Sequence, residues 1–153
     1  MTLKDVLDDV GSNIVKGAKR NLTRITTHGV RGKRYNSIAS GRLYNSLKTT
    51  VTAKVGSNNN PLSYQLVFEM KDYGYWVDQG RKPGPISIAG TKNLKDWMRT
   101  KNINSKFLFV IKRNIEKNGY RATKFFEKAY NDEIPNIDKL IDEMLVETQI
   151  ITS

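Results

Sequence analysis

The residue types that could do chemistry in this chain are few. His28 is the only histidine, and it lies among glycines and cations in the segment THGVRGKR. A lone histidine in such a setting is more often a solvated side chain than a general base or a metal ligand. A Ser-His-Asp arrangement needs a carboxylate to orient the imidazole, and no acid lies near His28 in the sequence. The chain has no cysteine, which excludes thiolate chemistry and a disulfide framework.

The sequence Glu69-Met70-Lys71 stands at the end of an expected strand, as a Glu-x-Lys does in metal-dependent nucleases. Such a site needs a second carboxylate, because a divalent ion on phosphate is held by at least two. No acid lies between Val10 and Phe68 to provide it. Strand alternation also places Glu69 and Lys71 opposite the apolar side chains, so solvent exposure explains both. We therefore expect no enzyme, no metal and no cofactor.

The stretch DYGYWVDQGRKPG, residues 72–84, is the most unusual in the chain. The segment GRKPGP at its end, residues 80–85, lacks the spacing of a phosphate-binding loop, and Pro83 and Pro85 remove two backbone donors that such a loop would use. The rings of the stretch, Tyr73, Tyr75 and Trp76, could stack on bases, as aromatic side chains do in single-strand binders. Aromatic residues directly after a core strand more often pack into the fold. We predict a structural corner with no catalytic role.

We expect a specific structural role for each residue of this corner. Gly80 supplies a positive φ and Pro83 a fixed φ, as a sharp reversal needs. Trp76 and Val77 are expected to anchor the corner on the sheet or on a long helix. Asp78 is placed to accept from backbone N–H groups or to meet a cation. The corner motif comprises Tyr73, Trp76, Asp78, Gly80 and Pro83.

Charge is the strongest signal in the composition. The 153 residues carry a net charge of +11, and residues 1–130 alone carry +16, from 25 cations and nine acids. A long acid-free basic region usually faces a polyanion, because phosphate neutralisation releases counterions. A solvated basic face is the alternative. The candidates for contact with DNA, or with a channel that holds it, are Lys16, Lys19, Arg20, Arg24, Arg31, Lys33 and Arg34.

The last 23 residues reverse the sign, with six acids and one lysine, a net charge of −5. This acidic tail could meet the basic body of another copy, so that copies associate head to tail. The candidates for that subunit contact are Asp138, Asp142 and Glu143. A solvated helix face is again the alternative.

Hydrophobic periodicity predicts the elements that carry these residues. Apolar residues from Leu3 to Ile25 recur at three- and four-residue spacing, which predicts a long helix ending near residues 26–29. A polar basic loop, HGVRGKRYNS, is expected next, and then a helical turn in SGRLYNSL. Helical patterns return at 94–98, 108–115, 125–130 and 137–145, with Gly119 as a stop.

Two segments instead alternate with a period of two, Leu47–Val55 and Leu62–Met70. Joined by the turn-rich GSNNNP, they predict an antiparallel hairpin. The fold class is therefore α+β, a long N-terminal helix packed on a small antiparallel sheet with additional C-terminal helices. We expect a single domain over residues 1–153. The longest apolar run, Phe107–Ile111, is too short to cross a bilayer, and the first residues lack a signal-peptide pattern, so a soluble protein made in a cytoplasm is expected.

Three segments together resemble the neck and tail-component proteins of long-tailed bacteriophages, which act in head–tail joining and tail completion. They are SGRLYNSL at 40–47, YGYWVDQGRKP at 73–83, and ATKFF at 122–126 followed by Ala129. Their order and spacing fit the family over residues 1–130. The chain departs from the family in a helical insertion at about 84–121 and in the acidic tail, residues 131–153.

The resemblance implies a non-enzymatic virion protein that forms an oligomeric ring around a DNA channel. Its partners would be other copies of itself, neighbouring neck, portal or tail proteins, and DNA contacted without base readout. It would be made in the bacterial cytoplasm, would end in the virion and would need no membrane. The alternative from another class is a free nucleic-acid-binding protein that uses the basic region, either a packaging accessory or a regulator with helices 90–117 as a helix-turn-helix.

Overall fold

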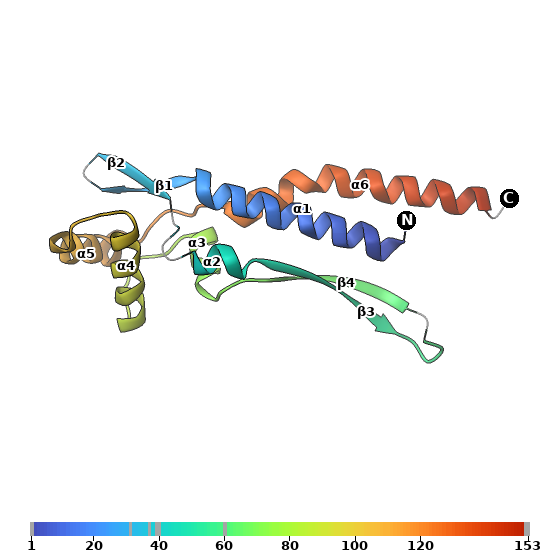
Figure 1. Ribbon diagram of the computed structural model, residues 1–153, viewed down its shortest axis with the longest axis horizontal. Helices are drawn as coiled ribbons and strands as arrows, with labels where there is room; N and C mark the ends of the chain where they lie inside the picture. Colours follow the sequence, from blue (N-terminus) through green and yellow to red (C-terminus); the bar gives the residue numbers. More distant parts are fainter. Residues whose placement is uncertain (1, 31, 37, 39–40, 60, 152–153) are drawn as a thin grey trace.

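The computed structural model describes residues 2–30, 32–36, 38, 41–59 and 61–151, with the side chains of 26–28, 61–62 and 144–151 left out of the description. The fold is α+β, as predicted, with an elongated outline (Figure 1). Its elements are α1 (Leu3–Arg24), β1 (Thr26–Val30), β2 (Lys33–Asn36), α2 (Arg42–Ser46), β3 (Lys48–Val55), β4 (Pro61–Glu69), α3 (Tyr73–Gln79), α4 (Ile88–Thr100), the 3-10 turn η1 (Ser105–Phe107), α5 (Leu108–Asn118) and α6 (Phe125–Ile151).

Helix α1 is the central helix, on which the other elements of the core pack. Its first turn is closed by a capping box, in which the Thr2 hydroxyl accepts from Asp5 N at 3.2 Å and Asp5 Oδ2 accepts from Thr2 N at 2.8 Å. Its apolar stripe is buried along the whole length, from Val6 to Leu22. The helix ends at Arg24, earlier than expected, because the chain enters strand β1 at Thr26.

Helix α6 lies antiparallel to α1 and covers one side of it (Figure 1). Two hydrogen bonds fix the register, from Asn21 Nδ2 to Phe125 O at 3.0 Å and from Asn13 Nδ2 to Glu133 Oε1 at 3.1 Å. The side chain of Ala129 packs on Gly17 between them. Because α6 is longer than α1, it extends past the N-terminus of α1 in Figure 1.

The prediction of a short helix at 125–130 and a separate later helix is wrong, since α6 is continuous over Phe125–Ile151. Pro135 lies inside it and removes one backbone donor, which normally ends or bends a helix. Apolar residues on both sides of Pro135 pack on the core, Ala129 before it and Ile137 and Leu140 after it. This packing on α1 favours one helix over two.

The hairpin predicted from alternation is confirmed as β3–β4, antiparallel from Lys48↔Glu69 to Val55↔Pro61. It packs under α1 at Gly11, where an added Cβ would lie 2.5 Å from Thr49 Oγ1 and 2.8 Å from Leu66 Cδ1. A side chain at Gly11 would therefore hold the helix away from the strands. Beyond this contact the hairpin runs out of the core, and Val55 is exposed.

The polar loop expected after α1 is instead a second hairpin, β1–β2, which does not pair with β3–β4. It closes between Val30 and Lys33, and Gly32 there has φ 79°. A short hairpin with a tight turn is held by its backbone hydrogen bonds and needs little alternation of apolar residues. The hydrophobic pattern therefore did not predict this hairpin.

The two helices expected at 84–121 are present as α4 and α5. With η1 between them they form what we call the lobe, residues 88–118, at one end of the molecule (Figure 1). Trp97 holds the lobe on β2, because its Nε1 donates to Asn36 O at 2.9 Å and its ring meets Tyr35 edge-on. Lys101 Nζ also donates to Asn36 Oδ1, and Arg42 pairs with Asp96 at 3.6 Å.

Candidate functional site

The three segments that carry the family resemblance meet in space. Leu43 of α2, Val77 of α3, and Phe125 and Ala129 of α6 all pack in the core formed with α1. Thr123 ties two of the segments together, because its hydroxyl donates to Val77 O at 2.7 Å and its backbone N–H to the same oxygen at 3.1 Å. We call this meeting point of α2, α3 and residues 122–129 the junction.

Asp78 is the buried acid of the junction. Its Oδ1 accepts from Phe126 N at 2.8 Å and from Glu127 N at 3.4 Å, and its Oδ2 accepts from Gln79 Nε2 at 2.6 Å. A carboxylate at this point satisfies free N–H groups of the first turn of α6 and complements the positive end of the helix. The prediction that Asp78 accepts from backbone N–H groups is confirmed, and the groups belong to a helix 48 residues further along the chain.

Gly80 ends α3 with φ 81°, as predicted for a residue that reverses the chain. An added Cβ would lie 2.7 Å from Ala122 N and 2.8 Å from Tyr120 O. Directly after it, Arg81 and Tyr120 exchange two backbone hydrogen bonds of 3.0 Å. Pro83 lies exposed in the connection to α4. The stretch therefore does redirect the chain, at its C-terminal end.

The first half of the same stretch corrects the corner hypothesis, because residues 73–79 form helix α3. A helical period places Gly74, Val77 and Asp78 on one inward face and turns Trp76 outward. Trp76 is 52% exposed and packs edge-on against Tyr75, so its predicted role as an anchor is wrong. Of that predicted pair, only Val77 packs against the core.

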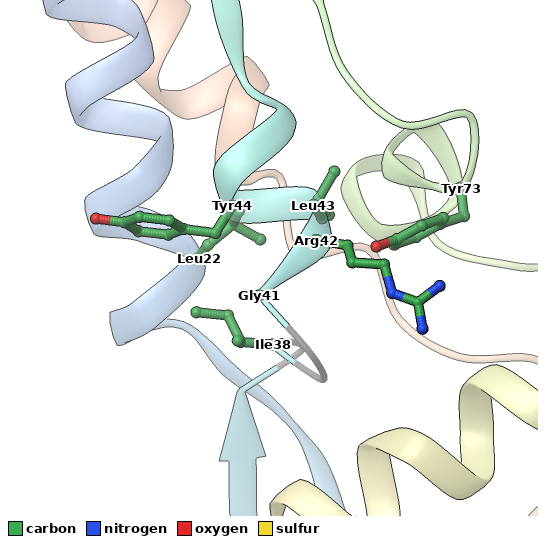
Figure 2. A pocket seen from close by; sticks show the side chains of 7 residues that line it. All are labelled: Leu22, Ile38, Gly41, Arg42, Leu43, Tyr44 and Tyr73. Atoms are coloured by element: carbon green, nitrogen blue, oxygen red, sulfur yellow. The ribbon is translucent and has the colours of Figure 1, made fainter.

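Tyr73 is one of the residues that line a small cavity beside α2 (Figure 2). The cavity holds about 20 Å³ and is lined mainly by apolar or aromatic side chains. Burial raises the pKa of the Tyr73 phenol. Ligand pockets usually hold ~300–1,000 Å³, so this cavity accepts a water molecule at most. Its lining residues are Leu22, Ile38, Gly41, Arg42, Leu43, Tyr44 and Tyr73.

The predicted DNA-facing residues divide into groups. Lys16, Arg20 and Arg24 are exposed and follow each other at four-residue spacing, which places them on one stripe of α1. Lys19 is half-buried, and its ammonium group lies 5.1 Å from the centre of the Tyr44 ring, so part of its charge serves the fold.

The remaining candidates belong to the β1–β2 hairpin. Lys33 and Arg34 are exposed neighbours on β2, and neighbours on a strand point to opposite faces. One surface therefore does not receive both. Arg31 lies outside the described residues.

The lobe adds cations that sequence reasoning did not include in the site. Lys92, Lys95 and Arg99 are exposed at three- and four-residue spacing on α4, and Arg113 is exposed on α5. The lobe and the β1–β2 hairpin lie at the same end of the molecule (Figure 1), which we call the basic end. The spacing on α4 was a usable signal, but sequence alone did not place α4 beside β2.

The predicted subunit-contact acids lie on the second half of α6. Asp138, Asp142 and Glu143 are all exposed, and Glu143 pairs with Lys139 at 3.7 Å. This part of α6 runs beside the first turns of α1, which carry Asp5, Asp8 and Asp9. The acids therefore gather at the end opposite the lobe, which we call the acidic end.

Within the described part of the chain, no three histidine, cysteine or acidic side chains gather as a metal site would require. The described helices include none with the length and apolar character of a membrane span. His28 lies on β1, and its side chain is outside the description.

No protein-family model, curated protein or solved structure matches this chain.

Proposed function

We propose that this chain is a structural protein of a tailed-bacteriophage virion, a ring-forming subunit at the neck or proximal tail around the DNA channel. The observation that carries the proposal is the junction. The segments resembling the phage family are 40–47, 73–83 and 122–129, and from each of them side chains meet in one buried cluster. Their residue types are explained by packing, capping and a positive φ, as a structural role requires.

The distribution of charge supports a ring. A ring closes by heterologous contacts, in which one surface of a subunit meets a different surface of the next. The basic end and the acidic end of this molecule are such a pair, opposite in sign and far apart along its long axis (Figure 1). The same subunits would contact neighbouring portal, neck or tail proteins above and below.

Contact with DNA rests on the α1 stripe. Lys16, Arg20 and Arg24 present three charges in a row, with no acid nearer in sequence than Asp9. Such a row suits phosphate contact without base readout, as a passing duplex requires. The mature protein would then be found in the virion after synthesis in the bacterial cytoplasm.

Two measurements on the purified chain test the proposal. Sedimentation should give a closed oligomer of fixed stoichiometry, and duplexes of unrelated sequence should bind with equal, salt-sensitive affinity. Replacing Lys16, Arg20 and Arg24 with glutamine should lower the slope of log K against log salt by about three, one for each phosphate that is no longer neutralised. Lys54→Gln, on the projecting hairpin, serves as the matched control and should leave the slope unchanged.

A free nucleic-acid-binding protein remains the second candidate, favoured by the exposed cations on α4. It would use Lys92, Lys95 and Arg99 and would bind one duplex much more tightly than others. A monomer or dimer with that preference would contradict the virion proposal. Trp97 and Met98 are buried on the same helix, so its opposite face would have to make the contact.

A further inference from the structure

Helix α5 exposes an apolar surface that nothing in the chain covers within the described residues. None of its residues is fully buried, and Phe109 and Val110 are 70% and 63% exposed. An open depression on the same face is lined by Phe109, Lys112, Arg113 and Glu116, and Lys112 pairs with Glu116 at 3.9 Å. Large apolar side chains beside cations, around a hollow, are typical of a binding surface.

Helix α6 exposes a second apolar surface along the flank of the face that packs on the core. Tyr130, Ile134 and Ile141 are all exposed, and their spacing of four and seven residues puts them on one stripe. Asp138 lies on this stripe between the two isoleucines, and Asp142 lies directly beside Ile141. The stripe therefore sets exposed apolar side chains beside acids, whereas the α5 surface sets them beside two cations and Glu116.

These two surfaces do not meet within one molecule. The lobe with α5 lies at one end, and the second half of α6 lies at the other (Figure 1). Each surface would stay solvated in an isolated subunit, although together they offer apolar area and opposite charge. A second copy of the same chain provides the missing partner for both.

We infer that the apolar stripe of α6 in one copy docks on α5 of the next copy. Ile141 or Ile134 would enter the depression beside Phe109, and Asp138 and Asp142 would face Lys112 and Arg113. The contact is heterologous, so it repeats from copy to copy and gives each subunit two contacts when the ring closes. This inference rests on the proposed ring and specifies which surfaces join its subunits.

Charge exchange tests the contact directly. One variant carries Lys112→Glu and Arg113→Glu, and the other carries Asp138→Lys and Asp142→Lys. All four side chains are exposed or half-exposed, so circular dichroism should show both variants folded. Each alone should self-associate about 100-fold more weakly, because like charges would then face each other.

Recombination of the variants gives the sharper result. Mixed in equal amounts, they should regain assembly with the two variants alternating, because each α6 stripe then meets an α5 surface of opposite charge on the other variant. A chain with all four changes has both charges exchanged and should regain assembly. Lys54→Glu, on the projecting hairpin, is the control and should assemble normally.

The apolar part of the contact has its own pair of variants. Phe109→Ser should weaken association by more than about tenfold, since exposed aromatic residues often anchor interfaces. Ile88→Ser removes an even more exposed apolar side chain on α4, outside the surface, and should have no effect.

The outcomes separate this inference from the proposed function. If the wild type forms a closed oligomer and both charge variants assemble equally well, the ring stands and the α5–α6 contact is overturned. If both variants fail but their mixture stays monomeric, the two surfaces do not face each other, and the inference is again overturned. If the wild type is monomeric at every concentration, the proposed ring itself is contradicted.

Discussion

The junction and the lobe use similar residues for opposite purposes. Phe125 in the junction is fully buried and lies beside a capped helix start, whereas Phe109 in the lobe is 70% exposed beside two cations. Trp97 is 9% exposed and donates a hydrogen bond, whereas Trp76 is 52% exposed. The residue type alone does not decide the role, because the same ring can fill a core or wait for a partner.

The difference also concerns how each region is held. The junction joins segments far apart in the chain through buried side chains and backbone hydrogen bonds. The lobe is attached to β2 through Trp97, to α2 through the Arg42–Asp96 pair, and to residues 84–86 through hydrogen bonds to Glu116. We therefore expect the junction to set global stability and the lobe to open locally.

The largest expected effect comes from Phe125→Ala, compared with Phe109→Ala. Truncating the buried ring should lower the free energy of unfolding by about 3–5 kcal/mol. Truncating the exposed ring should change it by less than about 0.5 kcal/mol. Denaturant unfolding of the two variants measures both, and equal destabilisation would contradict the contrast between junction and lobe.

Trp97→Ala should cost about 3 kcal/mol, at the lower end for a buried tryptophan because the site lies near the surface. The destabilisation should concentrate in the lobe and in β1–β2, because alanine can neither pack against the Tyr35 ring nor donate to Asn36 O. Hydrogen exchange should accelerate in α4 and β2 before α1 and α6. Trp76→Ala is the control and should leave exchange unchanged in all four elements.

Asp78→Ala should destabilise by about 2 kcal/mol, since hydrogen bonds to a charged group are worth ~1.5–3 kcal/mol. It leaves the N–H groups of Phe126 and Glu127 without their acceptor. Asp72→Ala removes an exposed acid that makes no capping bond to α3, and its melting temperature should match the wild type. A tolerated Asp78→Ala would mean that water replaces the cap.

Gly32→Ala has the smallest expected effect in this series, and Gly80→Ala is its comparison. Both glycines have a positive φ, 81° and 79°, so alanine is strained at both positions, and the ψ of −179° at Gly80 belongs to a region that essentially only glycine adopts. Only at Gly80 would the new Cβ also meet the backbone, at Ala122 N, whereas nothing lies within 4 Å at Gly32. Thermal unfolding should therefore show the larger loss for Gly80→Ala.

Much of the fold could be predicted from periodicity. The α1 stripe, the β3–β4 alternation and the two lobe helices all follow from apolar spacing. Helix α3 was missed because its inward face uses Gly74 and Asp78, which no apolar pattern counts. The helical spacing of Gly74, Val77 and Asp78 can be recognised only when Asp78 is known to be buried.

Less of the candidate site than of the fold could be predicted from the sequence. The distribution of charge along the sequence identified the cations of α1 and the acids of α6. The position of the lobe cations beside β2 became clear only from the structure, in which Trp97 packs on β2. The solvent exposure of a side chain was harder to predict than its charge, because exposure depends on neighbours that are distant in the chain. Trp76, which is exposed, and Trp97, which is buried, show this. The apolar stripe on the flank of α6 was likewise hidden by the helix break expected near Pro135.

The pairing of α1 with α6 also has a consequence for synthesis. The bond from Asn21 to Phe125 spans 104 residues, so α1 leaves the ribosome long before the helix that covers it. Until α6 emerges, the nascent chain exposes much of the apolar stripe of α1. Contacts this distant form slowly, and partly covered chains aggregate or recruit chaperones. Chains that stop before residue 125 should therefore accumulate in the insoluble fraction, however well their hairpins form.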